Sequence, residues 1–158
     1  MKLTYKKIDR KPENSFLASR RTIPHLEEYW HYHTELELIY FLKSTGTFYI
    51  GNTVDHFREG EIYFMGSNLP HLKKSDKSYY DPNRPDLIVD MIIVQFREDF
   101  LGKEFMVLPE TKNLESLFIK AARGVKYSKS TSCLLHDRLI ELPQTRGLSS
   151  LVDLLKIL

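Results

Sequence analysis

Two histidines and a glutamate close together in the sequence have the types and spacing needed for chemistry. His31, His33 and Glu37 are separated by even intervals. If residues 30–42 run as one extended strand, these three side chains share a face, because side chains alternate along a strand with a period of two. Glu35 has the same parity, so a local bulge would decide which glutamate points inward.

His71 adds a third histidine from further along the chain. It follows Glu37 by 34 residues and comes directly after Asn68-Leu-Pro70, a turn-like sequence that could return the chain opposite the first strand. Neutral imidazoles and one carboxylate suit a borderline divalent ion such as iron, manganese or zinc. The predicted metal ligands are His31, His33, Glu37 and His71, and the alternative is a metal-free cluster in which the histidines hydrogen-bond a buried carboxylate.

Short strands are the elements expected to position these residues. Between residues 36 and 96 the chain divides into pieces rich in Tyr, Phe, Ile and Val, separated by glycines and prolines. Each piece is short enough for one strand, so the pattern predicts a small β-barrel or β-sandwich. One further strand is expected between Asn68 and Pro85. The predicted strands are Leu36–Leu42, Thr47–Ile50, Val54–Phe57, Glu61–Met65 and Ile88–Phe96.

The character of the sequence changes after Phe96. Apolar residues then recur at intervals of three and four, which predicts three helices, over residues 114–125, 130–142 and 148–158. In the last helix the apolar stripe must be buried against the barrel or against a second copy of the chain. This stripe consists of Leu148, Leu151, Leu155 and Leu158. The single cysteine, Cys133, is expected to face a helix interior.

Composition limits the classes of function. The chain has 158 residues, 42% of them hydrophobic, which predicts one globular domain with a core of its own. Its 23 basic and 21 acidic residues argue against an independent nucleic-acid binder, which usually carries a marked basic excess. One cysteine excludes an internal disulfide and fits a reducing compartment. Apolar runs such as Met91–Val94 are far short of a bilayer span, so we expect a cytoplasmic protein without membrane contact.

The motifs resemble those of the cupin superfamily. The segments that carry the resemblance are Trp30–Glu37, Gly60-Glu61 and Asn68–His71. In metal-binding cupins, the first motif supplies two histidines and a glutamate, and the second supplies another histidine, at the mouth of a small β-barrel. The resemblance implies a mainly β fold: a cupin-type small β-barrel (double-stranded β-helix or jelly roll) followed by a helical tail.

The scaffold around these residues departs from the common cupin pattern and is similar to one branch of the superfamily. Residues other than the expected glycine, proline or asparagine occur at His25, Ser44, Gly66, Asn68 and Ser75. The departures shift the resemblance toward the amino-terminal cupin domain of AraC-type transcriptional regulators, and it covers nearly the whole chain. The strings that carry it are His31–Lys43, Gly46–Gly51, Gly66–His71 and Ile93–Phe96.

This second resemblance implies a role in regulation and no catalysis. It implies a cupin barrel over residues 1–110 and a helical tail over residues 111–158 through which the chain forms a homodimer. A small-molecule effector, with sugars as the first class to test, would bind inside the barrel. DNA would be contacted only through a separate carboxy-terminal unit with helix-turn-helix motifs. No such unit fits after Gly147, so we expect the sequence to be part of a longer protein. The residues expected to supply polar groups to the effector are His31, His33, Glu37, His71, Tyr40 and Gln95.

Two alternatives remain open from the sequence. One is a cupin metalloenzyme, such as a dioxygenase or an isomerase, that uses the four metal-ligand positions and leaves coordination sites for substrate. The altered motif residues and the long helical tail argue against it. The other keeps the regulatory role and treats the same four residues as a hydrogen-bonded cluster without metal.

Overall fold

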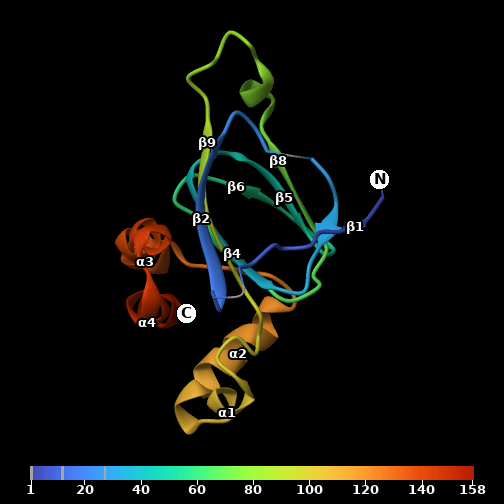
Figure 1. Ribbon diagram of the computed structural model, residues 1–158. Helices are drawn as coiled ribbons and strands as arrows, with labels where there is room; N and C mark the ends of the chain where they lie inside the picture. The colour runs from blue at the N-terminus through green and yellow to red at the C-terminus, as the bar shows by residue number, and fades with distance from the viewer. Residues whose placement is uncertain (1, 12, 27) are drawn as a thin grey trace.

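Two five-stranded sheets face each other and enclose the interior of a barrel (Figure 1). The computed structural model describes residues 2–11, 13–26 and 28–158. Strand pairing is antiparallel in both sheets except between β1 and β3. The first sheet has the order β1 (Thr4–Tyr5), β3 (His31–Tyr32), β8 (His71–Ser75), β5 (Gly46–Ile50) and β6 (Thr53–Phe57). The second has the order β10 (Val125–Lys126), β7 (Ile62–Met65), β4 (Leu36–Lys43), β9 (Val89–Phe96) and β2 (Phe16–Ile23).

The second sheet is covered on both of its faces. On β4, Ile39 and Phe41 pack into the barrel interior, whereas Leu36 and Leu38 pack on the opposite face against the helices. β9 is buried along its whole length. Strands that are covered on both faces read as nearly continuous apolar runs, as β4 and β9 do here.

The three longest helices follow the barrel in the chain and pack against the outer face of the second sheet (Figure 1). Apolar residues of the three longest helices, such as Phe118, Leu139 and Leu154, are buried in the core formed with that face. The helical elements are η1 (Lys77–Tyr80), α1 (Lys103–Met106), η2 (Pro109–Thr111), α2 (Lys112–Ala121), α3 (Lys129–Glu141), η3 (Leu142–Gln144) and α4 (Gly147–Ile157). None of the helices in the described ranges combines the length and apolar character needed to cross a membrane.

The predicted fold class, a mainly β cupin-type barrel followed by a helical tail, is confirmed. The five predicted strands and the additional one, β8, are present, and so are three helices close to their predicted ranges. The first of these helices ends at Ala121, so Val125 lies in the short strand β10 instead of in the helix. β10 pairs with β7, which ties the tail to the barrel sheet.

Two features of the strand pattern differ from the sequence prediction. The edge strand β2 was not predicted, because its polar centre, Ser19–Thr22, lacks the apolar pattern of the other strands. Residues 30–42 do not form one strand either. The chain bends at residues 33–35, so that β3 and β4 lie in different sheets.

Candidate functional site

The bend between β3 and β4 brings the predicted site together in a way that one strand would not. His31 lies on the first sheet and Glu37 on the second, and both side chains are buried between the two facing sheets. His71, on β8, is paired in register with His31. The prediction that His31, His33 and Glu37 share one face of a single strand is therefore wrong. The residues that it selected are nevertheless brought together in the barrel.

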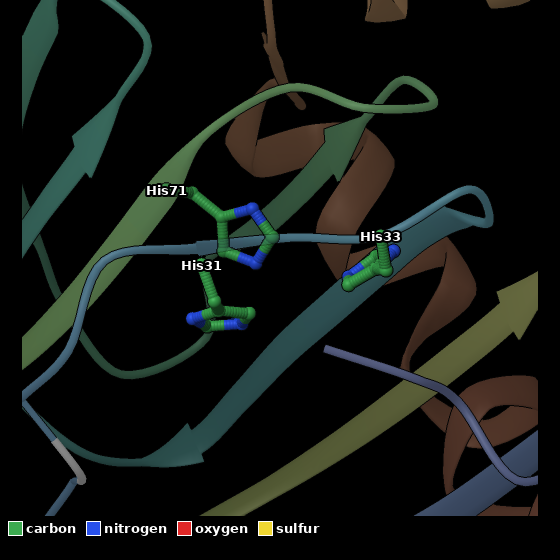
Figure 2. A group of neighbouring side chains, drawn as sticks. All are labelled: His31, His33 and His71. Carbon is green, nitrogen blue, oxygen red and sulfur yellow. The ribbon is translucent and has the colours of Figure 1, made fainter. Parts of the chain in front are cut away.

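Three histidine rings form the centre of the cluster (Figure 2). The ring centroids of His31 and His71 are 4.2 Å apart, and those of His33 and His71 are 5.2 Å apart. All three side chains are buried, and one ring nitrogen from each lies within 4.8 Å of those of the other two. The three rings therefore have the spacing of a histidine ligand set.

Backbone carbonyls fix the orientation of these rings. The Nδ1 atom of His31 lies 3.1 Å from the carbonyl oxygen of Tyr29, that of His33 lies 2.9 Å from Glu35 O, and that of His71 lies 2.9 Å from the oxygen of Leu69. A carbonyl oxygen can only accept, so each Nδ1 carries a proton and donates. In neutral His31 and His71 rings Nε2 is then a free acceptor, which is the arrangement found in histidine metal ligands with backbone support. Nε2 of His33 is not free, because it lies 3.1 Å from Oε2 of Glu37.

Glu37 is fully buried beside the histidines and is surrounded by donors. Its Oε1 lies 3.1 Å from Nζ of Lys73 and 3.5 Å from Nε2 of His71. Its Oε2 lies 3.1 Å from Nε2 of His33 and accepts a hydrogen bond from the amide of Gln95. Gln95 faces Glu37 in the β4–β9 register, so this predicted residue is brought to the cluster.

Lys73 is the residue of this cluster that sequence reasoning missed. Its side chain is buried, and its ammonium also lies 5.7 Å from the ring centroid of Phe48. A signal was present in the sequence, because Lys73 follows His71 by two residues on the same strand and therefore shares its face. A lysine at an inward-facing position of a strand is rarely buried unless it is paired.

Burial and the mutual charges of the cluster shift its proton equilibria. Burial alone would raise the pKa of Glu37, but the nearby Lys73 charge and the polar rings of His33 and His71 hold it well below its ordinary value. Burial lowers the pKa of Lys73, opposed by the Glu37 carboxylate. Burial, with the charges of His71 and Lys73, lowers the pKa of His31 to about 3. The interior therefore holds a charged Lys73–Glu37 pair beside a neutral His31.

The four predicted metal ligands fit a divalent ion only in part. The histidines fit: their rings are preoriented, and Nε2 of His71 is buried without a hydrogen-bond partner. The carboxylate does not fit, since both oxygens of Glu37 already accept from charged or polar donors. An ion at the cluster would also share a buried space with the Lys73 ammonium. The complete set, with Lys73 present, does not match a divalent cation site.

Tyr40 is not brought to this cluster. Its side chain lies on the outer face of β4, where its hydroxyl is 2.5 Å from Nδ1 of His136 on α3. The separation of three residues between Glu37 and Tyr40 places them on opposite faces of one strand, so parity already separated them in the sequence. This corrects the assignment of Tyr40 to the barrel interior.

Two other expectations also change. Glu35 lies at the bend, where its carbonyl accepts from His33 while its Oε2 is 3.9 Å from that ring, and it does not enter the centre of the cluster in place of Glu37. Cys133 is exposed on α3 instead of facing a helix interior. The apolar stripe of the last helix is divided, because Leu148 is 75% exposed while Leu154, outside the stripe, is fully buried.

Two surface cavities lie outside the cluster. One, of about 530 Å³, is bounded by the segment after β9 and by α2, with Phe118 and Ile119 in its wall. The other, of about 790 Å³, lies between residues 9–18 and the η3–α4 segment. Neither is lined by the barrel histidines.

Comparison with known proteins identifies the fold. No family model matches the sequence, and a search of curated proteins found no match. Among solved structures, ToxT from Vibrio cholerae, an AraC-family regulator, superposes on 89% of this chain with a TM-score of 0.53 and 9% identity. A second ToxT structure, bound to (E)-4-(8-methylnaphthalen-1-yl)but-3-enoic acid, covers 91% with the same TM-score and identity. The matches cover 53% and 54% of ToxT, so the chain spans about half the length of that protein.

A cupin protein from Bacteroides fragilis is also similar to part of this chain. It covers 60% of this chain and 85% of its own, with 12% identity and a TM-score of 0.43. The more extensive ToxT match includes the helical tail as well as the barrel, since it covers nine tenths of the chain. The resemblance to the amino-terminal domain of AraC-type regulators is therefore confirmed at the level of the fold.

Proposed function

We propose that this chain is the effector-sensing and dimerisation domain of an AraC-type transcriptional regulator. The barrel, residues 1–110, binds a small molecule, and the tail, residues 111–158, transmits its presence to a separate DNA-binding unit. The fold shared with ToxT, barrel and tail together, supports this proposal. ToxT itself has been solved with an organic carboxylic acid bound.

The buried polar interior of the barrel is the observation that carries the proposal. Glu37, Lys73 and Gln95 meet the histidines in an interior otherwise packed with apolar residues such as Phe48. Burying a charged pair costs several kcal/mol per ion in desolvation, and a well-packed apolar replacement is often as stable. A cluster of this kind is therefore better explained by recognition of a polar ligand than by stability.

The chemistry of the cluster favours a small ligand that carries several hydroxyl groups. A hydroxyl both donates and accepts, so one such group can donate to a free histidine Nε2 while another accepts from the Lys73 ammonium. Because these side chains are buried, ligand entry requires local opening of the barrel mouth at residues 33–35 or 66–70. Because Gly66 of the second loop is hydrogen-bonded to Ala121 in the tail, such an opening would also change the packing of the tail.

A thermal-shift series with a panel of monosaccharides and short carboxylic acids tests the sensing role. We expect at least one compound to raise Tm in a concentration-dependent way, and Gln95→Leu to weaken that response without unfolding the chain. Glu59→Gln, at an exposed turn, is the matched control and should respond like the wild type. A full-length regulator that responds in a reporter assay to a compound this domain never binds would refute the proposal.

We propose that the tail forms a homodimer and that DNA is contacted only through the separate unit. Leu148 and Val152 lie one turn apart on α4 and remain exposed, as expected of an interface residue pair. The near-balanced charge of the chain supports this proposal, in which the basic surface that contacts DNA belongs to the separate unit. A cytoplasmic location accords with this role and stays a prediction.

The metalloenzyme alternative has one observation in its favour, the preoriented histidine trio. It predicts that protein purified without chelator contains one equivalent of metal, and that His31→Ala and His71→Ala both lose it. The sensing proposal requires no such metal. Elemental analysis of the three proteins separates the two functions.

A further inference from the structure

The Lys73–Glu37 pair lies beside the three histidines, and it changes what the histidine cluster can bind. Nζ of Lys73 lies 3.1 Å from Oε1 of Glu37. The side chains of the pair are 10% and 2% exposed, so water screens their charges very little. The positive charge next to the carboxylate is therefore supplied by the chain itself.

The remaining contacts of Glu37 leave no free oxygen for a metal. Oε1 accepts a hydrogen bond from Lys73, and Oε2 accepts one from Gln95. Nε2 of His33 also lies 3.1 Å from Oε2. A metal–carboxylate bond would have to displace at least one of these donors and leave it buried. Displacing Lys73 would cost more free energy than displacing Gln95, since a buried charge without its partner destabilises a protein strongly.

The charges around the pair offer no compensation for an added ion. Lys6 and Arg21 also act on Lys73 and are positive. Among the residues that the structure describes, the other carboxylate close to the cluster is that of Glu35, which lies on the Nδ1 side of His33, away from Nε2. A divalent ion would bring two more positive charges into a buried cluster in which the Glu37 carboxylate is already neutralised.

We infer that Lys73 replaces a divalent cation in this barrel. The three histidines keep the spacing of a ligand set, but the ammonium neutralises Glu37 and repels an ion, so the native chain does not retain metal. Removing the Lys73 charge restores a metal site. This inference concerns the cluster alone and stands independently of the proposed effector.

Titration with Co²⁺ on tag-free protein tests the inference, followed by the visible absorption that tetrahedral cobalt develops and by stoichiometry. Lys73→Met keeps a side chain of similar length without the charge. We expect it to bind one equivalent of Co²⁺ about 100-fold or more tightly than the wild type, because a like charge a few ångströms from the ion is removed. Lys74→Met, the exposed neighbour that pairs with Glu28, is the matched control and should behave like the wild type.

Further variants distinguish a created site from surface binding. Adding His71→Ala to Lys73→Met should abolish the cobalt spectrum, and Co²⁺ should raise the Tm of Lys73→Met but not that of the wild type. Lys73→Met leaves the buried Glu37 carboxylate without its main partner, so a second variant controls for the loss of stability. The double variant Glu37→Gln with Lys73→Met removes both charges, keeps the three histidines and should also bind Co²⁺.

Two results would overturn the inference. One is a wild-type chain that binds one equivalent of Co²⁺ as tightly as the variants and loses it with His71→Ala. The other is a folded Lys73→Met or double variant that gains no affinity over the wild type. The wild-type titration together with His71→Ala decides the first case, so that case does not depend on the stability of Lys73→Met.

Discussion

The backbone N–H of Gly66 donates to the carbonyl oxygen of Ala121 across 2.7 Å, which joins the loop before His71 to the end of α2. The same loop reaches the histidine cluster: Asn68 N–H donates to the carbonyl of His33, and the ring of His71 donates to that of Leu69. One short segment is thus hydrogen-bonded to the cluster at one end and to the tail at the other. A movement of the histidine cluster would therefore act on the end of α2 through the hydrogen bonds of this loop.

Gly66→Ala is expected to loosen this junction. A Cβ at Gly66 would lie 2.8 Å from the Cα and N atoms of Ala122, closer than real contacts allow, and backbone atoms cannot move aside cheaply. We expect a loss of about 2 kcal/mol in the free energy of unfolding, measured by urea denaturation. Gly147→Ala meets no neighbour within 4 Å and carries only the strain of a positive φ, so it should cost less. Equal losses in the two variants would argue against the tight packing at Gly66.

Asp90→Asn is expected to weaken the edge strand β2 in a pH-dependent way. Arg20 donates to Asp90 from Nε at 2.9 Å and from Nη2 at 2.6 Å, which joins β2 to β9. These hydrogen bonds lower the pKa of Asp90. The side chain of Arg20 is 48% exposed, so solvent screening limits the contribution of the pair to about 1 kcal/mol or less.

The sign of the pH effect follows from the lowered pKa of Asp90. The contribution of Asp90 is fully present above its unfolded pKa of about 4 and is lost as the pH falls through its folded value. Urea denaturation should show Asp90→Asn less stable than the wild type at neutral pH, with the difference shrinking in acid. Asp86→Asn, in an exposed pair with Arg84, serves as the control and should show no comparable change. A difference that grows in acid would contradict the assignment.

Tyr40 and His136 are expected to be energetically coupled in holding α3 against the barrel. The Tyr40 hydroxyl lies 2.5 Å from Nδ1 of His136, while the ring of Tyr40 is buried in the core under the helices. A double-mutant cycle with Tyr40→Phe and His136→Ala should give a coupling of about 1 kcal/mol in unfolding free energy. The same cycle with His56→Ala, on β6 of the other sheet, should give none. A coupling indistinguishable from zero at His136 would remove this contact from the account of how the tail docks.

Leu148→Glu is expected to reduce self-association without unfolding the chain. Leu148 is 75% exposed, so the charge costs little in the monomer, whereas in a dimer interface it would be buried without a partner. Sedimentation velocity at micromolar concentration should show the dimer dissociation constant rising at least about tenfold. Val54→Glu, a 61% exposed apolar position on β6, is the control and should sediment like the wild type. A wild type that is monomeric throughout would refute the proposed dimer.

The strands and helices that could be predicted are those with one dominant local signal. β4 and β9 have both faces covered and show it as apolar runs, while α3 and α4 show helical spacing. β2 could not be predicted in this way, because an edge strand needs only partial burial and its centre is polar. Its place in the sheet comes from pairing with β9, a partner more than 60 residues away in the chain.

The sequence by itself determined that the chain folds as a β-barrel with a helical tail and that His31, Glu37 and His71 belong together. Residue type, strand periodicity and motif resemblance are all local, and they suffice for that much. Only the tertiary structure decided what the site is electrostatically. Lys73 meets Glu37 because β8 and β4, in different sheets, face each other across the barrel, and contact across two stacked sheets leaves no local pattern. That contact converts a plausible metal site into a lysine–carboxylate site.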